Sequence, residues 1–113
     1  MLAHPSTNGP SYLKAYREEY VDDFADVADE IHIADSIIFG QLTHPGGEET
    51  GDWGMTEQLA PSPSPSDADE MPKRIEPHEI ARIRNAFAAS AVNLTDAGFD
   101  GIEIAANAFS IVQ

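Results

Sequence analysis

The sequence predicts an α/β fold in which helices alternate with short strands that pair in parallel. Two stretches with apolar residues at spacings of three and four each precede a short apolar run containing β-branched residues, a pattern typical of a helix followed by a buried strand. Strands that alternate with helices favour right-handed crossovers and parallel pairing. The length of 113 residues, 42% of them hydrophobic, allows one small domain or a piece of a larger one.

The first half of the chain contains one predicted helix and one predicted strand. Residues 1–15 form an irregular lead-in, because the first eleven hold two prolines, a glycine and an asparagine without any period. Residues 16–32 predict an amphipathic helix with acidic residues on its outer face. Its apolar positions are Tyr20, Phe24, Val27, Ala28 and Ile31. Residues 36–42 read SIIFGQL, a continuous apolar run that predicts a strand buried on both faces.

The second half repeats this order after a long connection. Residues 43–76 contain PGG and the repeat PSPSPS, which predict a loop of a length that is usually functional or disordered. Pro77 and Glu79 suit the first turn of a helix, and Gly98 suits its C-terminal cap. The apolar positions of this helix are Ile80, Ile83, Phe87, Ala91 and Leu94. Residues 101–105 read GIEIA and predict the second strand.

Two parallel strands do not make a covered sheet, because each has an open edge that needs a partner. The helix–strand pattern therefore looks like an excerpt of a larger α/β architecture. A (β/α)8 barrel needs about 250 residues, and this chain supplies about a quarter to a third of its elements.

The charge of the chain excludes several classes of partner. Twenty acidic residues against six Lys and Arg give a net charge of −14, which repels phosphate backbones and anionic membranes. The apolar runs are far shorter than the ~20 residues of a membrane span, so we expect a cytoplasmic protein without nucleic-acid partners. Acids spread evenly along a chain with only two lysines resemble the protein style of salt-loving archaea, although an ordinary acidic protein remains an alternative. The absence of cysteine excludes disulfides and thiolate chemistry.

Three stretches carry a resemblance to a known family, in the right order and at plausible spacing. Residues 40–46 read GQLTHPG, residues 59–62 read LAPS, and the third stretch, residues 79–104, contains EI, FAA and AGFDGIEI in that order. They resemble the Q-L-x-H-x-G-R, A-P-S and A-G-F-D-G-V-E-I motifs of the old yellow enzyme family, the FMN-dependent NADH:flavin oxidoreductases that include the 2,4-dienoyl-CoA reductases. The resemblance covers nearly the whole chain and implies the third and fourth strands of a partial (β/α)8 barrel, with residues 1–113 as a barrel fragment.

The resemblance implies FMN as cofactor, NAD(P)H as reductant and an activated alkene as substrate. By matched motif, Gln41 takes the role of the glutamine that bonds the pyrimidine side of the flavin, which suits an amide with one acceptor and one donor group. The alternative is that Gln41 only ends a strand. His44 lies just past the same strand end, where barrel enzymes place their sites, and is a second candidate for the cofactor. The alternative for His44 is a loop histidine with structural hydrogen bonds.

The sequence departs from the family at the substrate clamp, which in the family reads H-x-x-[HN]-G-Y. Residues 104–109 read IAANAF, so the histidine is missing and Asn107 is the single candidate for a substrate contact. Gly47 stands where the family motif continues with arginine. The family segments before the third strand and after the fourth, including the phosphate-binding loops, have no counterpart in these 113 residues.

The remaining polar residues indicate no further chemistry. The four histidines show no i, i+4 pairing, so we predict no metal site, and the paired acids are most simply solvated charge. We predict no catalytic residue from the residue pattern. Two hypotheses for function stay open. The chain is either a segment of an FMN-dependent ene-reductase, completed by the missing barrel segments or by self-association, or a non-catalytic remnant that serves as an acidic interaction or scaffold piece.

Overall fold

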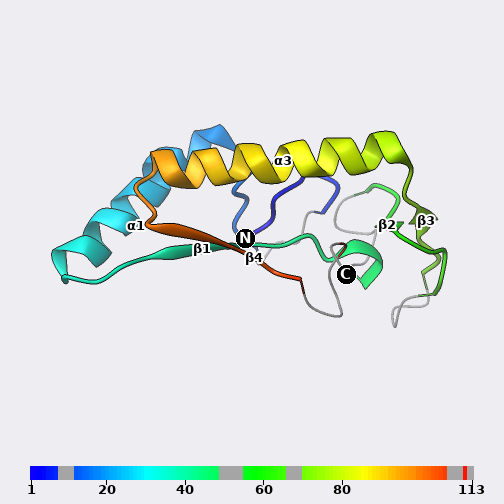
Figure 1. Cartoon of the computed structure of the whole chain (residues 1–113), viewed down its shortest axis with the longest axis horizontal. Helices are drawn as coiled ribbons and strands as arrows, with labels where there is room; N and C mark the ends of the chain where they lie inside the picture. The colour runs from blue at the N-terminus through cyan, green and yellow to red at the C-terminus, as the bar shows by residue number, and fades with distance from the viewer. Residues whose placement is uncertain (8–11, 49–54, 66–69, 107–110, 112–113) are drawn as a thin grey trace.

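The structure is a computed structural model that describes residues 1–7, 12–48, 55–65, 70–106 and 111 (Figure 1). Helices and strands alternate along these residues, which confirms the predicted α/β class. The elements are the 3-10 turn η1 (Glu18–Tyr20), α1 (Val21–Ile33), β1 (Phe39–Leu42), the 3-10 turn η2 (Gly46–Glu48), β2 (Leu59–Ala60), β3 (Lys73–Arg74), α3 (Pro77–Asp96) and β4 (Gly101–Ile104).

The two main strands pair in parallel, as predicted. β1 lies beside β4 with Phe39 opposite Gly101 and Leu42 opposite Ile104. Directly paired residues of parallel strands point to the same face, so Gln41 and Glu103, which also pair, project to one face together. Both strands end at the same edge, which is the edge where α/β proteins place their sites.

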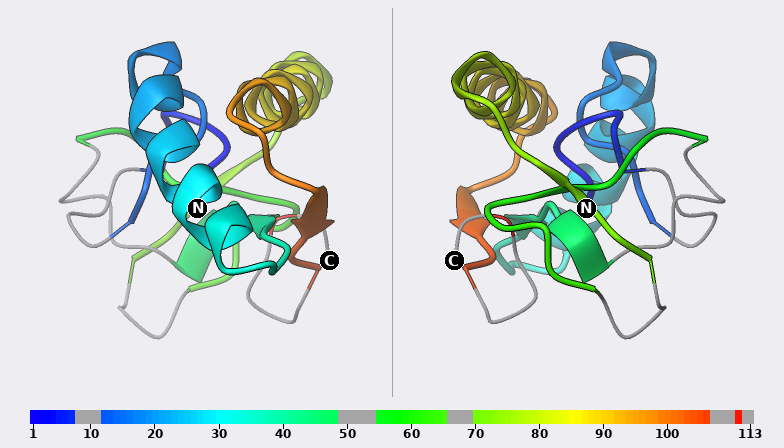
Figure 2. Two further views of the ribbon diagram at one scale, coloured as in Figure 1. Left: turned by 90° about the vertical axis from the view of Figure 1, so that its left-hand side faces the viewer. Right: turned by 90° about the vertical axis from the view of Figure 1, so that its right-hand side faces the viewer.

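Both long helices cover one face of the β1–β4 pair (Figure 2). On that face Gly40 and Leu42 are buried, whereas Phe39 and Gln41 on the opposite face are exposed. The prediction that residues 36–42 are buried on both faces is therefore wrong, and Phe39 is 58% exposed. The apolar run was correct as a strand signal, but the described part of the chain holds no second layer to cover the other face.

The lead-in is more structured than its irregular sequence predicts. Leu2 and Ala3 are fully buried, and Leu2 forms parallel bridges to Lys14 on one side and to Thr43 on the other. The Leu2 N–H donates to Leu13 at 2.8 Å, and the Thr43 N–H donates to Met1 at 2.9 Å. These residues pack against the core. Their burial could not be predicted from the sequence, because two or three positions are too few for a periodic apolar pattern to show.

The long connection also contains structure that the loop prediction missed. β2 and β3 form a two-residue parallel ladder, in which the Lys73 N–H donates to Gln58 and the Ile75 N–H donates to Ala60, both at 2.8 Å. Leu59 and Ala60 are buried, which accounts for the order of this segment. The prolines of residues 61–65 lack N–H groups and stay outside the ladder.

The ends of α3 follow the capping signals in the sequence. Pro77 occupies the first turn, and the Glu79 carboxylate accepts the Glu76 N–H at 2.9 Å. At the other end Gly98 has φ +87°, its N–H donates to Thr95 at 3.0 Å, and the Phe99 N–H donates to Leu94 at 3.0 Å. This is a Schellman arrangement in which glycine takes the left-handed position without a Cβ penalty.

Asp100 explains part of the AGFDG motif. Its carboxylate accepts the Ile38 N–H at 2.9 Å and the His32 ring N–H at 2.8 Å. The side chain thereby ties the start of β4 to the end of α1 and to the residue before β1. The Phe99 ring packs edge-on against Phe24 of α1, with ring centroids 6.4 Å apart. In this structure, Phe99 and Asp100 of the motif therefore join α1 to the sheet.

Candidate functional site

Gln41 and Glu103 form the polar feature nearest the shared strand ends. Gln41 is the third residue of β1 and Glu103 the third of β4, and both side chains are exposed. The Gln41 Nε2 donates to Glu103 Oε1 at 2.7 Å. The structure thus places the predicted cofactor residue Gln41 on the face that the helices leave open, with a carboxylate directly beside it.

His44 follows β1 and is buried, with 1% of its surface exposed. Its Nδ1 accepts the Gly46 N–H at 3.1 Å, so the ring proton is on Nε2, which donates to Ser6 Oγ at 2.9 Å. The Ser6 hydroxyl then donates to His4 Nδ1 at 2.7 Å. Both nitrogens of His44 are therefore engaged, and the chain of hydrogen bonds connects the lead-in to the segment after β1.

The histidines of this chain of hydrogen bonds are held neutral. Burial, and secondarily the nearby His4, lower the pKa of His44 from 6.5 to about 4. Burial, and secondarily the positive charge of Arg82, also lower the pKa of His4. The two rings lie 5.9 Å apart between centroids. Neutral rings are what the hydrogen bonds require, because each Nδ1 acts as an acceptor.

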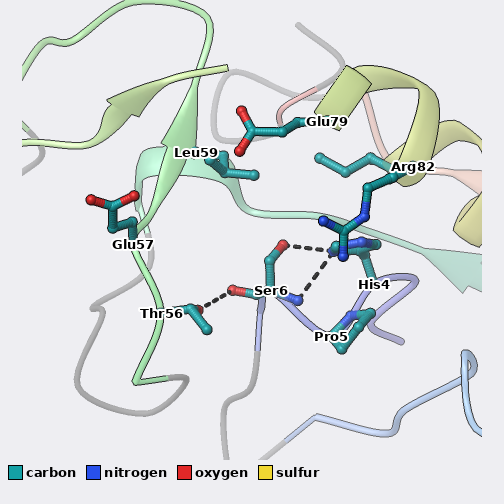
Figure 3. A pocket seen from close by; sticks show the side chains of 9 residues that line it. His4, Pro5, Ser6, Thr56, Glu57, Leu59, Glu79 and Arg82 are labelled. Atoms are coloured by element: carbon teal, nitrogen blue, oxygen red, sulfur yellow. Dashed lines mark hydrogen bonds between the residues drawn. The ribbon is translucent and has the colours of Figure 1, made fainter. Parts of the chain in front are cut away.

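A pocket of about 320 Å³ opens beside these hydrogen bonds, between the lead-in, the segment before β2 and the start of α3 (Figure 3). Its walls include His4, Ser6, Thr56, Glu57 and Arg82. The Thr56 hydroxyl donates to the Ser6 carbonyl at 3.2 Å, and this bond ties the two loops together.

Ser6 lies between two histidines, an arrangement in which a histidine could act as a base that activates the serine hydroxyl as a nucleophile. An activating histidine must take up a proton and be stabilised as a cation, usually by a carboxylate. Here burial and Arg82 disfavour the charged form of His4, and the Nδ1 of His44 meets a backbone N–H instead of a carboxylate. The arrangement therefore supports structure and not nucleophilic catalysis.

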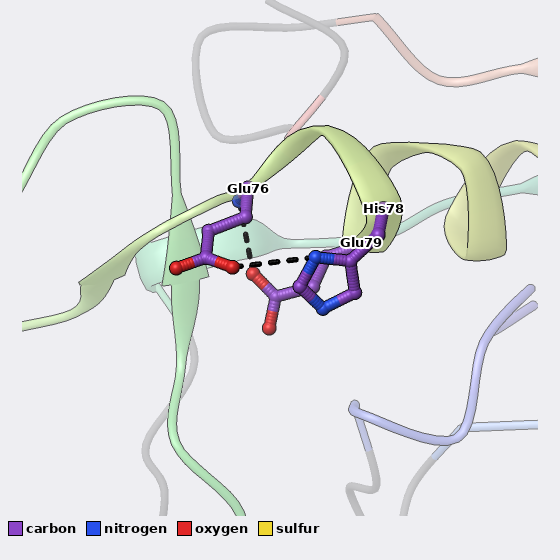
Figure 4. Close-up of side chains that lie close together, drawn as sticks. All are labelled: Glu76, His78 and Glu79. Carbon is purple, nitrogen blue, oxygen red and sulfur yellow. Dashed lines mark hydrogen bonds and ion pairs between the residues drawn. The ribbon is translucent and has the colours of Figure 1, made fainter.

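Three ligand-type side chains meet at the start of α3, where sequence spacing predicted no metal site (Figure 4). Candidate ligand atoms of Glu76, His78 and Glu79 all lie within 4.8 Å of one another. His78 Nδ1 is 3.2 Å from Glu76, and the Lys73 ammonium is 2.7 Å from Glu79. Glu76 and His78 are exposed and the lysine already balances Glu79, so this is most simply a surface charge cluster.

One predicted site residue falls outside the described residues, and three residues near the site were not predicted. Asn107, the predicted substrate contact, lies outside the described residues. Sequence reasoning missed Glu103, Ser6 and Arg82. Glu103 had a usable signal, because it alternates with Ile102 and Ile104 and therefore faces the same side as Gln41 once the strands pair. Ser6 and Arg82 carry no local signal, since only the tertiary fold brings them to His44 and His4.

Comparison with known proteins places this geometry in a family. Residues 4–113 match the NADH:flavin oxidoreductase / NADH oxidase family, so the chain belongs to that family of flavin-dependent oxidoreductases. The cofactor of the family is FMN and its reductant is NAD(P)H. This match confirms the resemblance that the three motifs indicated.

Individual relatives are longer than this chain. It is 36% identical over 105 residues to a probable N-methylproline demethylase of Rhizobium meliloti (strain 1021), covering 89% of this chain and 15% of that protein. It is 33% identical over 109 residues to the putative 12-oxophytodienoate reductase 9 of Oryza sativa subsp. japonica, covering 92% of this chain and 26% of the relative. The 113 residues therefore span about a quarter or less of these relatives.

Solved structures share the fold. An old yellow enzyme homologue from Zymomonas mobilis matches 91% of this chain with a TM-score of 0.82 at 21% identity, and the match covers 32% of that chain. The α/β arrangement with parallel strands is therefore that of one part of a larger enzyme. Within the described residues, no helix is long and apolar enough to cross a membrane.

Proposed function

We propose that this chain is part of an FMN-dependent NAD(P)H oxidoreductase and forms the third and fourth strands of its (β/α)8 barrel. The observation that carries the proposal is Gln41, an exposed amide near the C-terminal end of β1 within the GQLTHPG stretch. The strand ends of such barrels hold the site, and the uncovered face of β1 and β4 is the face that would point into the barrel. The parallel register supports this placement.

The side chains at the strand ends fit one edge of the flavin ring. The Gln41 amide offers an acceptor oxygen and a second N–H beyond the one bonded to Glu103. This pair matches an edge on which donor and acceptor alternate, as they do on the pyrimidine side of a flavin. When bound, FMN supplies hydride transfer from NAD(P)H to an electron-poor double bond. The contribution of Gln41 is to bind and orient that edge.

The start of α3, the helix end beside the pocket of His4 and Ser6, is a poor site for the phosphate of FMN. It carries the carboxylates of Glu76 and Glu79, which repel a phosphate. The site is therefore proposed to be completed by chain segments outside these 113 residues.

His44 and Asn107 are assigned to different parts of the proposed site, His44 to the cofactor and Asn107 to the substrate. We assign His44 to the cofactor site by its position after β1, where its ring holds Ser6 and the Gly46 backbone and so shapes the loop next to the flavin. Asn107 is proposed as an amide donor to the carbonyl oxygen of an activated alkene, by its place in the motif. A donor at that atom would stabilise the negative charge that develops during reduction.

The exposed apolar surface supports completion by further barrel segments. A pocket of about 370 Å³ lies between α3 and β4 and is lined by Ile80, Ile83, Phe87 and Ile104 among others. Ile80 and Ile104 are 51% and 55% exposed, and Phe39 is open on the other face. Apolar surface on both sides of a two-stranded sheet is typical of an element that packs inside a larger fold.

We also propose a cytoplasmic location and adaptation to high salt.

A chimeric barrel tests the proposed function. Residues 4–113 would replace the matching segment of a full-length relative, and retained FMN would be measured by flavin absorbance after dialysis. We expect FMN to be retained, and the Gln41→Ala variant to bind FMN about tenfold more weakly, as expected for one or two lost hydrogen bonds. Glu30→Ala, on the outer face of α1, is the matched control. Equal FMN affinity of all three chimeras would contradict the role of Gln41.

The alternative is a non-catalytic remnant that serves as an acidic interaction piece. It is favoured by the missing histidine of the substrate clamp. A folded chimera that fails to retain FMN would favour this alternative.

A further inference from the structure

The hydrogen bond between Gln41 and Glu103 constrains the Gln41 amide in a way that the matched motif does not reveal. The two residues face each other across the parallel pair of β1 and β4, with 2.7 Å between Nε2 and Oε1. An amide has two ends of similar shape, one a donor and one an acceptor, and either end could point toward a neighbouring strand. The chemistry of the neighbour decides which end it is.

An ionised carboxylate accepts hydrogen bonds and donates none. With Glu103 beside it, Gln41 must therefore turn its NH2 group toward β4, and its Oε1 must point away from β4. The reverse orientation would place two acceptor oxygens at hydrogen-bonding distance with no proton between them. The charge on Glu103 also makes the bond stronger than one between neutral groups.

We propose that Glu103 is a positioning residue that fixes the orientation of the Gln41 amide. This inference rests on the proposed role of Gln41 toward the flavin and adds a residue that acts through Gln41 without itself contacting the cofactor. The fixed amide presents a free acceptor oxygen with one remaining N–H next to it. Such a pair recognises an imide-like edge, in which an N–H lies beside a carbonyl.

The other charged group at Gln41 acts on its backbone. The Met1 ammonium donates to the Gln41 carbonyl oxygen at 2.7 Å. A comparison of variants at position 103 leaves this contact unchanged, so the effect of Glu103 can be measured separately.

The test follows the side-chain amide of Gln41 by NMR in the 15N-labelled 113-residue chain at ~3 M KCl, where charges are screened within about 3 Å. At pH 7 we expect the two Nε2 proton resonances of Gln41 to move away from their wild-type positions in Glu103→Ala, because the bond to the Glu103 carboxylate is lost. Glu30→Ala, which removes the same charge from the outer face of α1, should leave both resonances at their wild-type positions.

A second arm uses FMN at millimolar concentration as the probe. We expect FMN to perturb the Gln41 amide resonances in the wild-type chain, and Glu103→Gln and Glu103→Ala to weaken this binding ~3- to 10-fold. Glu103→Ala is included because the amide oxygen introduced by Glu103→Gln could still accept a hydrogen bond from Gln41 Nε2.

The outcomes separate the two proposals. Gln41 resonances that stay at their wild-type positions in Glu103→Ala, or that move equally in Glu30→Ala, overturn the positioning role of Glu103 whatever FMN does. Gln41 resonances that move only when residue 103 is changed, and that do not respond to FMN, support the positioning role and contradict the flavin contact of Gln41.

Discussion

Buried histidine His44 makes the stability of the chain depend on pH. Its pKa is lowered from 6.5 to about 4, so between these values the unfolded chain binds a proton that the folded chain does not. The contribution of His44 to stability is complete above pH 6.5 and is lost as the pH falls toward 4. At pH 5 the loss relative to pH 7.5 is about 2 kcal/mol. We expect urea unfolding in ~3 M KCl to show this decrease.

The comparison that isolates His44 uses two variants. His44→Gln should lose less unfolding free energy than the wild type between pH 7.5 and pH 5, because the titrating ring is gone. Ser64→Ala, which changes an exposed side chain that does not titrate, should behave like the wild type. A wild-type chain whose pH dependence equals that of His44→Gln would show that the ring is not held neutral. The 20 acidic residues are common to all three proteins and cancel in the comparison.

The buried amide of Gln58 lowers the stability of the chain, and a substitution can remove this effect. It is 8% exposed, and neither its amide oxygen nor its amide nitrogen has a hydrogen-bond partner among the described residues. An unpaired buried amide costs on the order of 1–3 kcal/mol. Gln58→Met keeps the length of the side chain, so we expect it to raise the free energy of unfolding by about 1 kcal/mol in urea titrations. Gln58→Glu, which buries a charge at the same place, should lower it. Equal stability of all three chains would mean that the amide is solvated.

At the scale of elements, the two strands tolerate an added methyl group differently. A Cβ on Gly40 would lie 2.5 Å from Cδ1 of Leu94, a fully buried residue of α3. A Cβ on Gly101 would meet the ring of Phe39, which is largely exposed and free to turn away. Gly40→Ala should therefore destabilise the chain by about 1–3 kcal/mol through overpacking, and Gly101→Ala by clearly less.

Thermal unfolding followed by circular dichroism at 222 nm compares these two variants. A larger loss of Tm for Gly101→Ala than for Gly40→Ala would mean that α3 does not pack on β1 at Gly40. Gly40 and Gly101 both lie in the parallel β1–β4 pair, so the comparison tests the packing and not the strand propensity.

The elements also show which features a sequence can predict. The helices could be predicted because their apolar spacing and their end signals, such as Pro77 and Gly98, agree. β2 and β3 could not, because two residues each are too short for a period and their order comes from burial of Leu59 and Ala60. The exposed face of β1 was predicted to be buried. An apolar run indicates that a strand packs against other residues, but it does not show whether those residues belong to the same chain.

The candidate site divides in the same way. Gln41 could be placed by motif and strand position, and the structure puts it on the expected edge. Glu103 required the register of two strands, and the contacts among His4, Ser6 and His44 required the path of the lead-in. Hydrogen bonds between distant segments leave no trace in local pattern, so this part of the site appears only in three dimensions.

The whole molecule is loosely built and strongly charged, and both properties should make its folding depend on salt. Its radius of gyration is 14.9 Å, compared with about 13 Å for a compact domain of this length. On α1, the carboxylates of Asp22, Asp26 and Glu30 repel their neighbours four residues away, at roughly 0.2–0.5 kcal/mol for each pair. We expect helical circular dichroism to rise between ~0.1 M and ~3 M KCl. Sucrose of matched osmolality is the control, and an equal rise in sucrose would contradict an electrostatic cause.

The isolated chain should also lack the activity of the complete enzyme. One or two hydrogen bonds to FMN, worth about 1 kcal/mol each, do not offset the ~4 kcal/mol or more lost on association. In ~3 M KCl, we expect no quenching of flavin fluorescence at micromolar protein and no NADH-driven reduction of an enone. Micromolar quenching with turnover would show that copies of the chain complete the barrel with one another.

The pairing of β1 with β4 has a consequence for how the chain is made. The bonded residues Gln41 and Glu103 are 62 positions apart, which a ribosome adding about 5–20 residues per second covers in roughly 3–12 s. The bridge from Leu2 to Thr43 joins residues of the first 43 and can form before that interval ends. During synthesis β1 is therefore held on one side by the lead-in while its other edge waits for β4. Phe39, which later pairs with Gly101 of β4 and stays exposed on the uncovered face of β1, is part of the apolar surface that the nascent chain presents during this interval.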